Sequence, residues 1–112
     1  MRINYGKFSS VVRYLKKNMP LAFPVSARRM YGLPTDTMAD VDIVEKDKEK
    51  RFVIRISRKL GNDISILMLL HEWAHALCWH PESKFSPPDH GAEWGVAYSR
   101  VYYCFERYLD QE

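Results

Sequence analysis

Two histidines and a glutamate stand close together in the run His71-Glu72-Trp73-Ala74-His75. On a helix, side chains four residues apart lie on one face, about 6 Å apart along the axis, so the two imidazoles would converge on one point. Two nitrogen donors at this spacing suit a tetrahedral zinc ion. A catalytic zinc site takes three protein ligands and leaves the fourth position to water. The run therefore predicts a metal site on a helix.

Glu72 follows the first histidine by one helical step of about 100° around the axis. Zinc lowers the pKa of its water to about 7, and a general base must then take the proton. Glu72 can lean over the open position and accept it. The alternative is that both histidines are satisfied by hydrogen bonds, with Glu72 capping a nearby group. Burying two imidazoles and a carboxylate on an apolar helix is costly without partners, and a cation would supply one for all three.

A third ligand has to come from another part of the chain, and the segment from residue 89 to residue 94 offers two candidates. His90 is the first, because the neighbouring Gly91 lets the backbone approach closely and the preceding loop is long enough for the chain to reverse. Glu93 is the rival, since a carboxylate on a following helix can complete such a site. Otherwise Glu93 would cap the last helix or support a ligand. We predict His90 as the third ligand.

Two other residues near the motif are predicted not to bind the metal. His80 lies nine residues after His71, which places it on the opposite side of a helix. Cys78 shares the ligand face but lies two turns beyond His71, so we expect it to pack beneath the site. Cys78 and Cys104 are the only cysteines. They are too few for a disulfide framework or a four-cysteine zinc site, and we expect free, buried thiols.

The sequence resembles the SprT/Spartan-like zinc metalloproteases at two places, residues 69–76 and residues 90–94. The first contains the motif above, which many peptidases share. The second is similar to that family's histidine-glycine motif, followed by an acid and an aromatic residue. The resemblance covers residues 64–105 well. It implies zinc bound by His71, His75 and His90, with Glu72 as the catalytic base, and it implies association with DNA.

The elements that must position these residues can be read from apolar periodicity. Residues 8–19 repeat at helical spacing and end before Pro20. Residues 21–29 are apolar enough for a strand, which Pro24 confines to a sheet edge or to one end. Residues 30–37 are expected to form a loop. An apolar stretch from 64 to 79 without Gly or Pro predicts a buried helix.

Two further segments complete the expected fold. Val41 and Ile43 alternate with two aspartates, and Phe52, Ile54 and Ile56 alternate with Val53, Arg55 and Ser57. This alternation predicts a hairpin around the charged turn at 46–50. Helical spacing recurs from Trp94 to Tyr108. We predict an α+β fold, a compact zincin-like domain over residues 1–112, with about three strands packed on the buried active-site helix and flanking helices. We expect the strand at 51–57 to bind an extended peptide by edge pairing.

Composition indicates an ordinary globular protein. Of the 112 residues, 46% are hydrophobic and 28% are charged. No apolar run approaches the roughly 20 residues that cross a bilayer, and charges stand where a signal peptide would be apolar, so a cytoplasmic location is expected and no membrane contact.

The positive charge is concentrated near the N-terminus. Residues 1–35 carry seven basic side chains and no acid, whereas residues 36–112 carry 10 basic and 14 acidic ones, a balance of −4. With the resemblance, this favours weak DNA binding through the basic segment, without sequence preference. A solvated basic face is the alternative.

The sequence as a whole predicts a zinc-dependent metallopeptidase that acts on a protein or peptide substrate. Two alternatives remain at this point. One is a binding or adaptor module in which zinc only stabilises a small core. The other is a zinc hydrolase of a non-peptide amide. Glu72 argues against the first, because a structural metal site needs no base.

Overall fold

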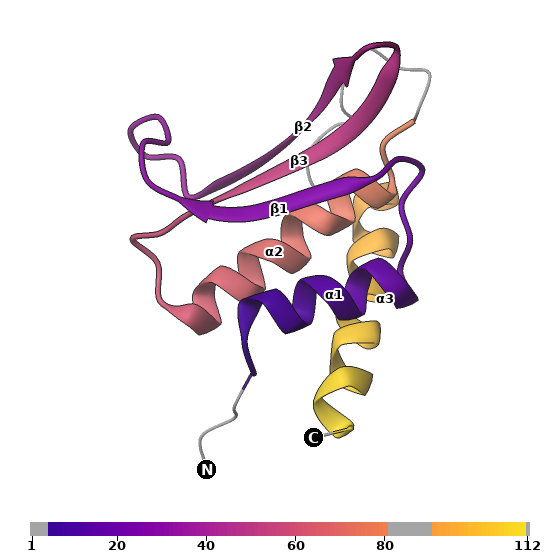
Figure 1. Ribbon diagram of the computed structural model, residues 1–112. Coiled ribbons are helices and arrows are strands. Elements are labelled where there is room, and N and C mark those ends of the chain that lie inside the picture. Colours follow the sequence, from indigo (N-terminus) through magenta and orange to yellow (C-terminus); the bar gives the residue numbers. More distant parts are fainter. Residues whose placement is uncertain (1–4, 81–90, 112) are drawn as a thin grey trace.

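The computed structural model describes residues 5–80 and 91–111. These residues form an α+β domain with a mixed sheet and helices (Figure 1), as predicted. The elements in chain order are α1 (Phe8–Asn18), β1 (Val25–Met30), β2 (Ala39–Lys46), β3 (Glu49–Ser57), α2 (Asn62–Leu77) and α3 (Ala92–Asp110).

The sheet has the strand order β1-β3-β2. Strands β2 and β3 form the predicted antiparallel hairpin, in which Val41 lies opposite Ile54. The turn is tighter than the charged stretch suggested. It consists of Asp47 and Lys48, whose φ angles of 55° and 68° match the two-residue turns that suit the twist of a hairpin. The hairpin thus needs no glycine at this turn.

Strand β1 begins directly after Pro24 and lies at an edge of the sheet, which agrees with the prediction that the proline stands at a sheet edge or at one end of the strand. It pairs in parallel with β3. Strand β3 is therefore the central strand, with a neighbour on each side. The prediction that residues 51–57 offer a free edge to a peptide is wrong. The physical reason is that β1 and β2 already pair with the backbone of β3 on its two sides, so β3 has no free N–H and C=O groups to offer a peptide.

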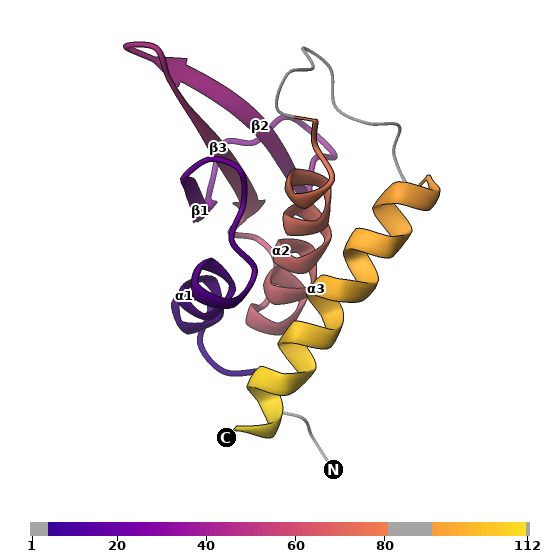
Figure 2. The same cartoon turned by 90° about the vertical axis from the view of Figure 1, so that its right-hand side faces the viewer.

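Helix α2 packs on one face of the sheet, between α1 and α3 (Figures 1 and 2). It is apolar nearly all round, and Ile66, Leu69, Leu70 and Trp73 are completely buried. The Trp73 indole Nε1 donates a hydrogen bond to the backbone oxygen of Met19, 3.0 Å away. This bond joins α2 to the end of α1.

Helices α1 and α3 each bury one face, which is narrower than the buried surface of α2. Val11 and Leu15 of α1 and Val101 and Phe105 of α3 are almost fully buried. Helix α2 begins two residues before the predicted start and ends two residues before the predicted end. Both cysteines are buried and free, as expected. Within the described residues, no helix has the length and apolar character that crossing a membrane requires.

The first prediction concerns the contact between α2 and α1. Replacing Trp73 with Phe should lower the free energy of unfolding by about 1–3 kcal/mol, because the substitution leaves a small void and an unpaired Met19 oxygen. Urea denaturation measures the loss. Tyr103→Phe, at a side chain that is 65% exposed, is the control and should change stability little. Equal midpoints for Trp73→Phe and wild type would contradict the contact.

Candidate metal centre

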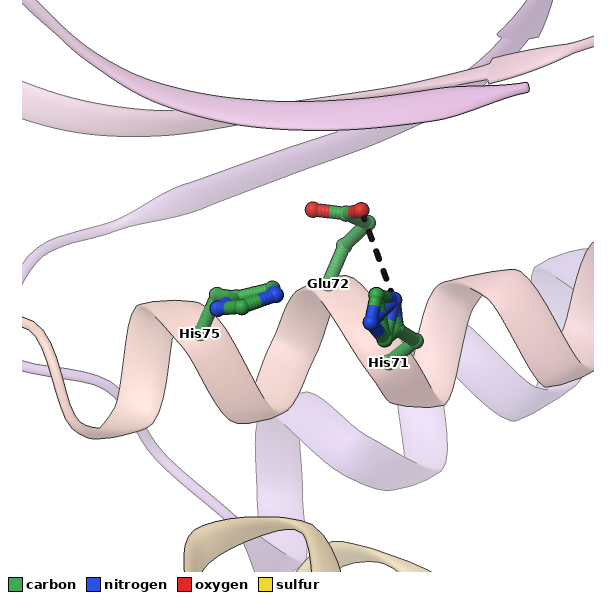
Figure 3. A group of neighbouring side chains, drawn as sticks. All are labelled: His71, Glu72 and His75. Carbon is green, nitrogen blue, oxygen red and sulfur yellow. Dashed lines mark ion pairs between the residues drawn. The ribbon is translucent and has the colours of Figure 1, made fainter. Parts of the chain in front are cut away.

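The site lies on the third and fourth turns of α2, a helix of 16 residues. The part of α2 from Glu72 to Ala76 is buried, so the polar side chains of Glu72 and His75 are largely kept from solvent. Figure 3 shows the imidazoles of His71 and His75 on one side of α2, with the Glu72 carboxylate projecting toward the sheet. The predicted helix is thus present, and it carries these three side chains together.

The three side chains form a compact group. The ring centroids of His71 and His75 are 4.8 Å apart, with an interplanar angle of 76°. One nitrogen of each histidine and one carboxylate oxygen of Glu72 all lie within 4.8 Å of one another. Imidazole nitrogens and a carboxylate are donors that zinc and other first-row divalent ions accept. The group could therefore hold a metal ion.

Burial makes this group unusual for polar residues. Glu72 and His75 are each 6% exposed, whereas the side chain of His71 is 26% exposed. Within the group, His71 Nδ1 lies 3.7 Å from Glu72 Oε1. Removing a carboxylate from water is costly unless charges and hydrogen bonds offset the cost. A cation bound between the three would offset that cost directly.

Helix α3 provides an aromatic wall beside the histidines. The Trp94 ring centroid lies 5.1 Å from that of His71 and 5.5 Å from that of His75. Its indole Nε1 lies 3.4 Å from the His71 backbone oxygen, and its ring stacks on Tyr98 at 4.9 Å. In the sequence, Trp94 belongs to the apolar repeat and to the second motif, and neither indicates this contact. Its contact with both imidazoles depends on how α3 crosses α2, which spacing alone does not show.

Of the two candidates for a third ligand, the structure describes Glu93 alone. His90 lies outside the described residues. Glu93 is described, and its carboxylate points to a different partner, with Oε1 lying 3.1 Å from Nε2 of His80. Both of these side chains are more than half exposed. Among the residues that could hold a metal within the described ranges, Glu93 does not join the group on α2.

The two remaining residues near the motif do not belong to the metal-binding group. His80 follows the end of α2 and is exposed. Cys78 is buried, and its Sγ lies 3.6 Å from the backbone oxygen of His75. Burial raises the pKa of the Cys78 thiol, and Glu93 adds to the effect. The thiol therefore remains protonated at neutral pH, as expected of a cysteine that packs beside the site.

The second prediction separates the two candidate ligands. His90→Ala should lower zinc affinity at least tenfold more than Glu93→Gln, because Glu93 already pairs with an exposed histidine outside the group. Competition with a chromophoric chelator measures both affinities. His80→Ala serves as a control and should bind zinc as the wild type does. The reverse order would transfer the third position to Glu93.

No protein-family model, curated protein or solved structure matches the sequence or the fold.

Proposed function

We propose that this protein is a zinc-dependent peptidase similar to the SprT/Spartan-like enzymes. In this proposal His71, His75 and His90 hold the zinc, and Glu72 is the general base. The observation that carries it is the group on α2, where two imidazole nitrogens and a carboxylate oxygen lie within 4.8 Å of one another on a buried helix. Its donor set and its buried carboxylate fit a catalytic zinc site.

A zinc ion at this site would supply a Lewis acid for the scissile carbonyl and would lower the pKa of a water molecule to about 7. The protein supplies the proton transfers. Glu72 accepts the proton of the attacking water and delivers it to the leaving amine. Its burial at 6% exposure keeps bulk water away, which strengthens electrostatic interactions with the reacting atoms.

The sheet offers a second element for a peptide substrate. Because β3 is paired on both sides, only β1 and β2 keep an unpaired edge within the described residues. Strand β2 is the one nearer α3 (Figure 2), the helix whose Trp94 contacts both histidines. We therefore place an extended substrate along β2, where its backbone would form sheet hydrogen bonds.

The third prediction concerns metal content. Purified wild type should contain about one zinc per chain, and His71→Ala or His75→Ala should lose the metal together with much of the thermal stability, since metal binding also stabilises the fold in a domain this small. Elemental analysis and thermal melting measure both effects. His80→Ala is the matched control and should keep the metal. A metal-free protein whose Tm does not change on adding zinc would exclude the site.

The fourth prediction assigns the base. Glu72→Gln should keep zinc and fold but lower the rate of peptide hydrolysis by about 10²–10⁴-fold, because the amide preserves shape and cannot accept the proton. Casein cleavage and elemental analysis measure activity and zinc content. Glu106→Gln, at an exposed position on α3, is the control. Comparable activity in Glu72→Gln would remove Glu72 from this role. A zinc-loaded wild type without hydrolytic activity would favour a non-catalytic zinc module.

A further inference from the structure

A second polar site lies at the start of α2, away from the metal-binding group on the third and fourth turns of this helix. A shallow cavity of about 460 Å³, wide open to solvent, lies between the start of α1, strand β1 and the start of α2. Four of its eight lining residues are cationic and none is acidic. The polar residues that line it are Lys7, Ser9, Arg28, Arg29, Arg58 and Asn62.

The four cations reach this cavity from three parts of the chain. Lys7 precedes α1, Arg28 and Arg29 belong to β1, and Arg58 follows β3. Strands β1 and β3 are parallel, so their carboxyl ends lie side by side at the same end of the sheet. This arrangement brings the side chains together. Only three of the four come from the basic N-terminal segment, and Arg58 joins them through the fold.

The arginines are held by backbone carbonyls rather than by acids. Arg29 Nη2 donates to the backbone oxygen of Leu60 at 2.7 Å, and Arg58 Nη2 donates to that of Arg29 at 3.2 Å. The Arg29 Nε is buried and has no hydrogen-bond partner. Within the described ranges, none of the four cations pairs with a carboxylate. No carboxylate of the described residues therefore forms a close ion pair that would neutralise them.

Two helix N-termini point their positive ends at the same region (Figure 1). Helix α1 has no side-chain cap and no acid in its first turn. Asn62, the first residue of α2, donates from Nδ2 to the backbone oxygen of Gly6 at 2.9 Å, which holds the two starts together. Asp63 is the acid in the first turn of α2, but it does not line the cavity. Unsatisfied N–H groups and the helix dipoles both favour an anion here.

We propose that this cavity binds a phosphate group. Arginine guanidinium groups and helix N–H groups match the charge and the several acceptor oxygens of phosphate. A cavity of about 460 Å³ also leaves room for the group attached to the phosphate. The source is either a soluble phosphorylated compound or the phosphodiester backbone of a nucleic acid. Nine residues separate Asn62 from His71, about 14 Å along α2, so this site is distinct from the metal centre.

The chain offers a control with matched charge. Lys16 and Lys17 lie at the other end of α1, in its last turn. Lys7→Glu/Arg58→Glu and Lys16→Glu/Lys17→Glu change the net charge equally, and only the first pair lines the cavity. A third variant, Ser9→Asp, puts an acid in the first turn of α1. This change should maintain or raise the Tm through the helix dipole while repelling a bound anion, which separates lost binding from lost folding.

The experiment uses the full chain and two kinds of probe. Calorimetric titration with inorganic phosphate and with ATP, against sodium chloride at equal ionic strength, tests soluble anions. Fluorescence anisotropy with single- and double-stranded DNA oligonucleotides at low and moderate salt tests the polymer. We expect Lys7→Glu/Arg58→Glu and Ser9→Asp to weaken binding roughly tenfold or more, with Lys16→Glu/Lys17→Glu close to wild type.

The pattern of binding identifies the source of the phosphate. Binding of ATP or phosphate without DNA binding would assign the cavity to a soluble compound, and DNA binding with displacement by phosphate would assign it to a nucleic acid. Failure of wild type to bind any of these probes at low salt would overturn the proposal. Equal weakening by the two charge-reversal pairs would also overturn it, because general charge would then explain the binding. Neither result depends on zinc or on hydrolysis.

Discussion

The burial of Glu72 and His75 on an otherwise apolar helix is the constraint on which the rest of the structure depends. Moving an ionised carboxylate out of water costs several kcal/mol unless other charges and hydrogen bonds offset it. An apolar residue at either position would pack between the sheet and α3 without that cost. The cost supports a chemical role for these side chains, because packing alone would not retain them.

The hairpin and the buried helix could be predicted because their signals are local. The alternation of Phe52, Ile54 and Ile56 has the period of a strand with one buried face, and residues 64–79 lack any helix breaker. Pro24 correctly limited the strand to an edge or to one end, because a proline cannot donate to a neighbouring strand, and β1 begins directly after it. The convergence of His71 and His75 was also predictable, since helical geometry alone fixes residues four apart.

The features that sequence analysis missed all depend on long-range pairing. The alternation of apolar residues shows that β3 has a buried face. It does not show how many strands pair with β3, so the central position of β3 was not predicted. The contact of Trp94 with the histidines depends on the crossing of α3 over α2. The cationic cavity combines Lys7 with Arg58, 51 positions later in the chain. Charge counting along the sequence grouped Lys7 with Lys16, which the fold places at the other end of α1.

The parallel pairing of β1 with β3 links the two candidate sites. It places the carboxyl ends of both strands at the same end of the sheet. The segment between β3 and α2 is short, so α2 also begins at that end. The first turn of α2 therefore lies among the cations that collect there, and its third and fourth turns lie beneath the sheet beside α3. Because α2 is a rigid buried helix, the position of its first turn also fixes where His71 and His75 lie. A contact that holds the start of α2, such as that between Asn62 and Gly6, thus helps to position the metal-binding group roughly 14 Å away.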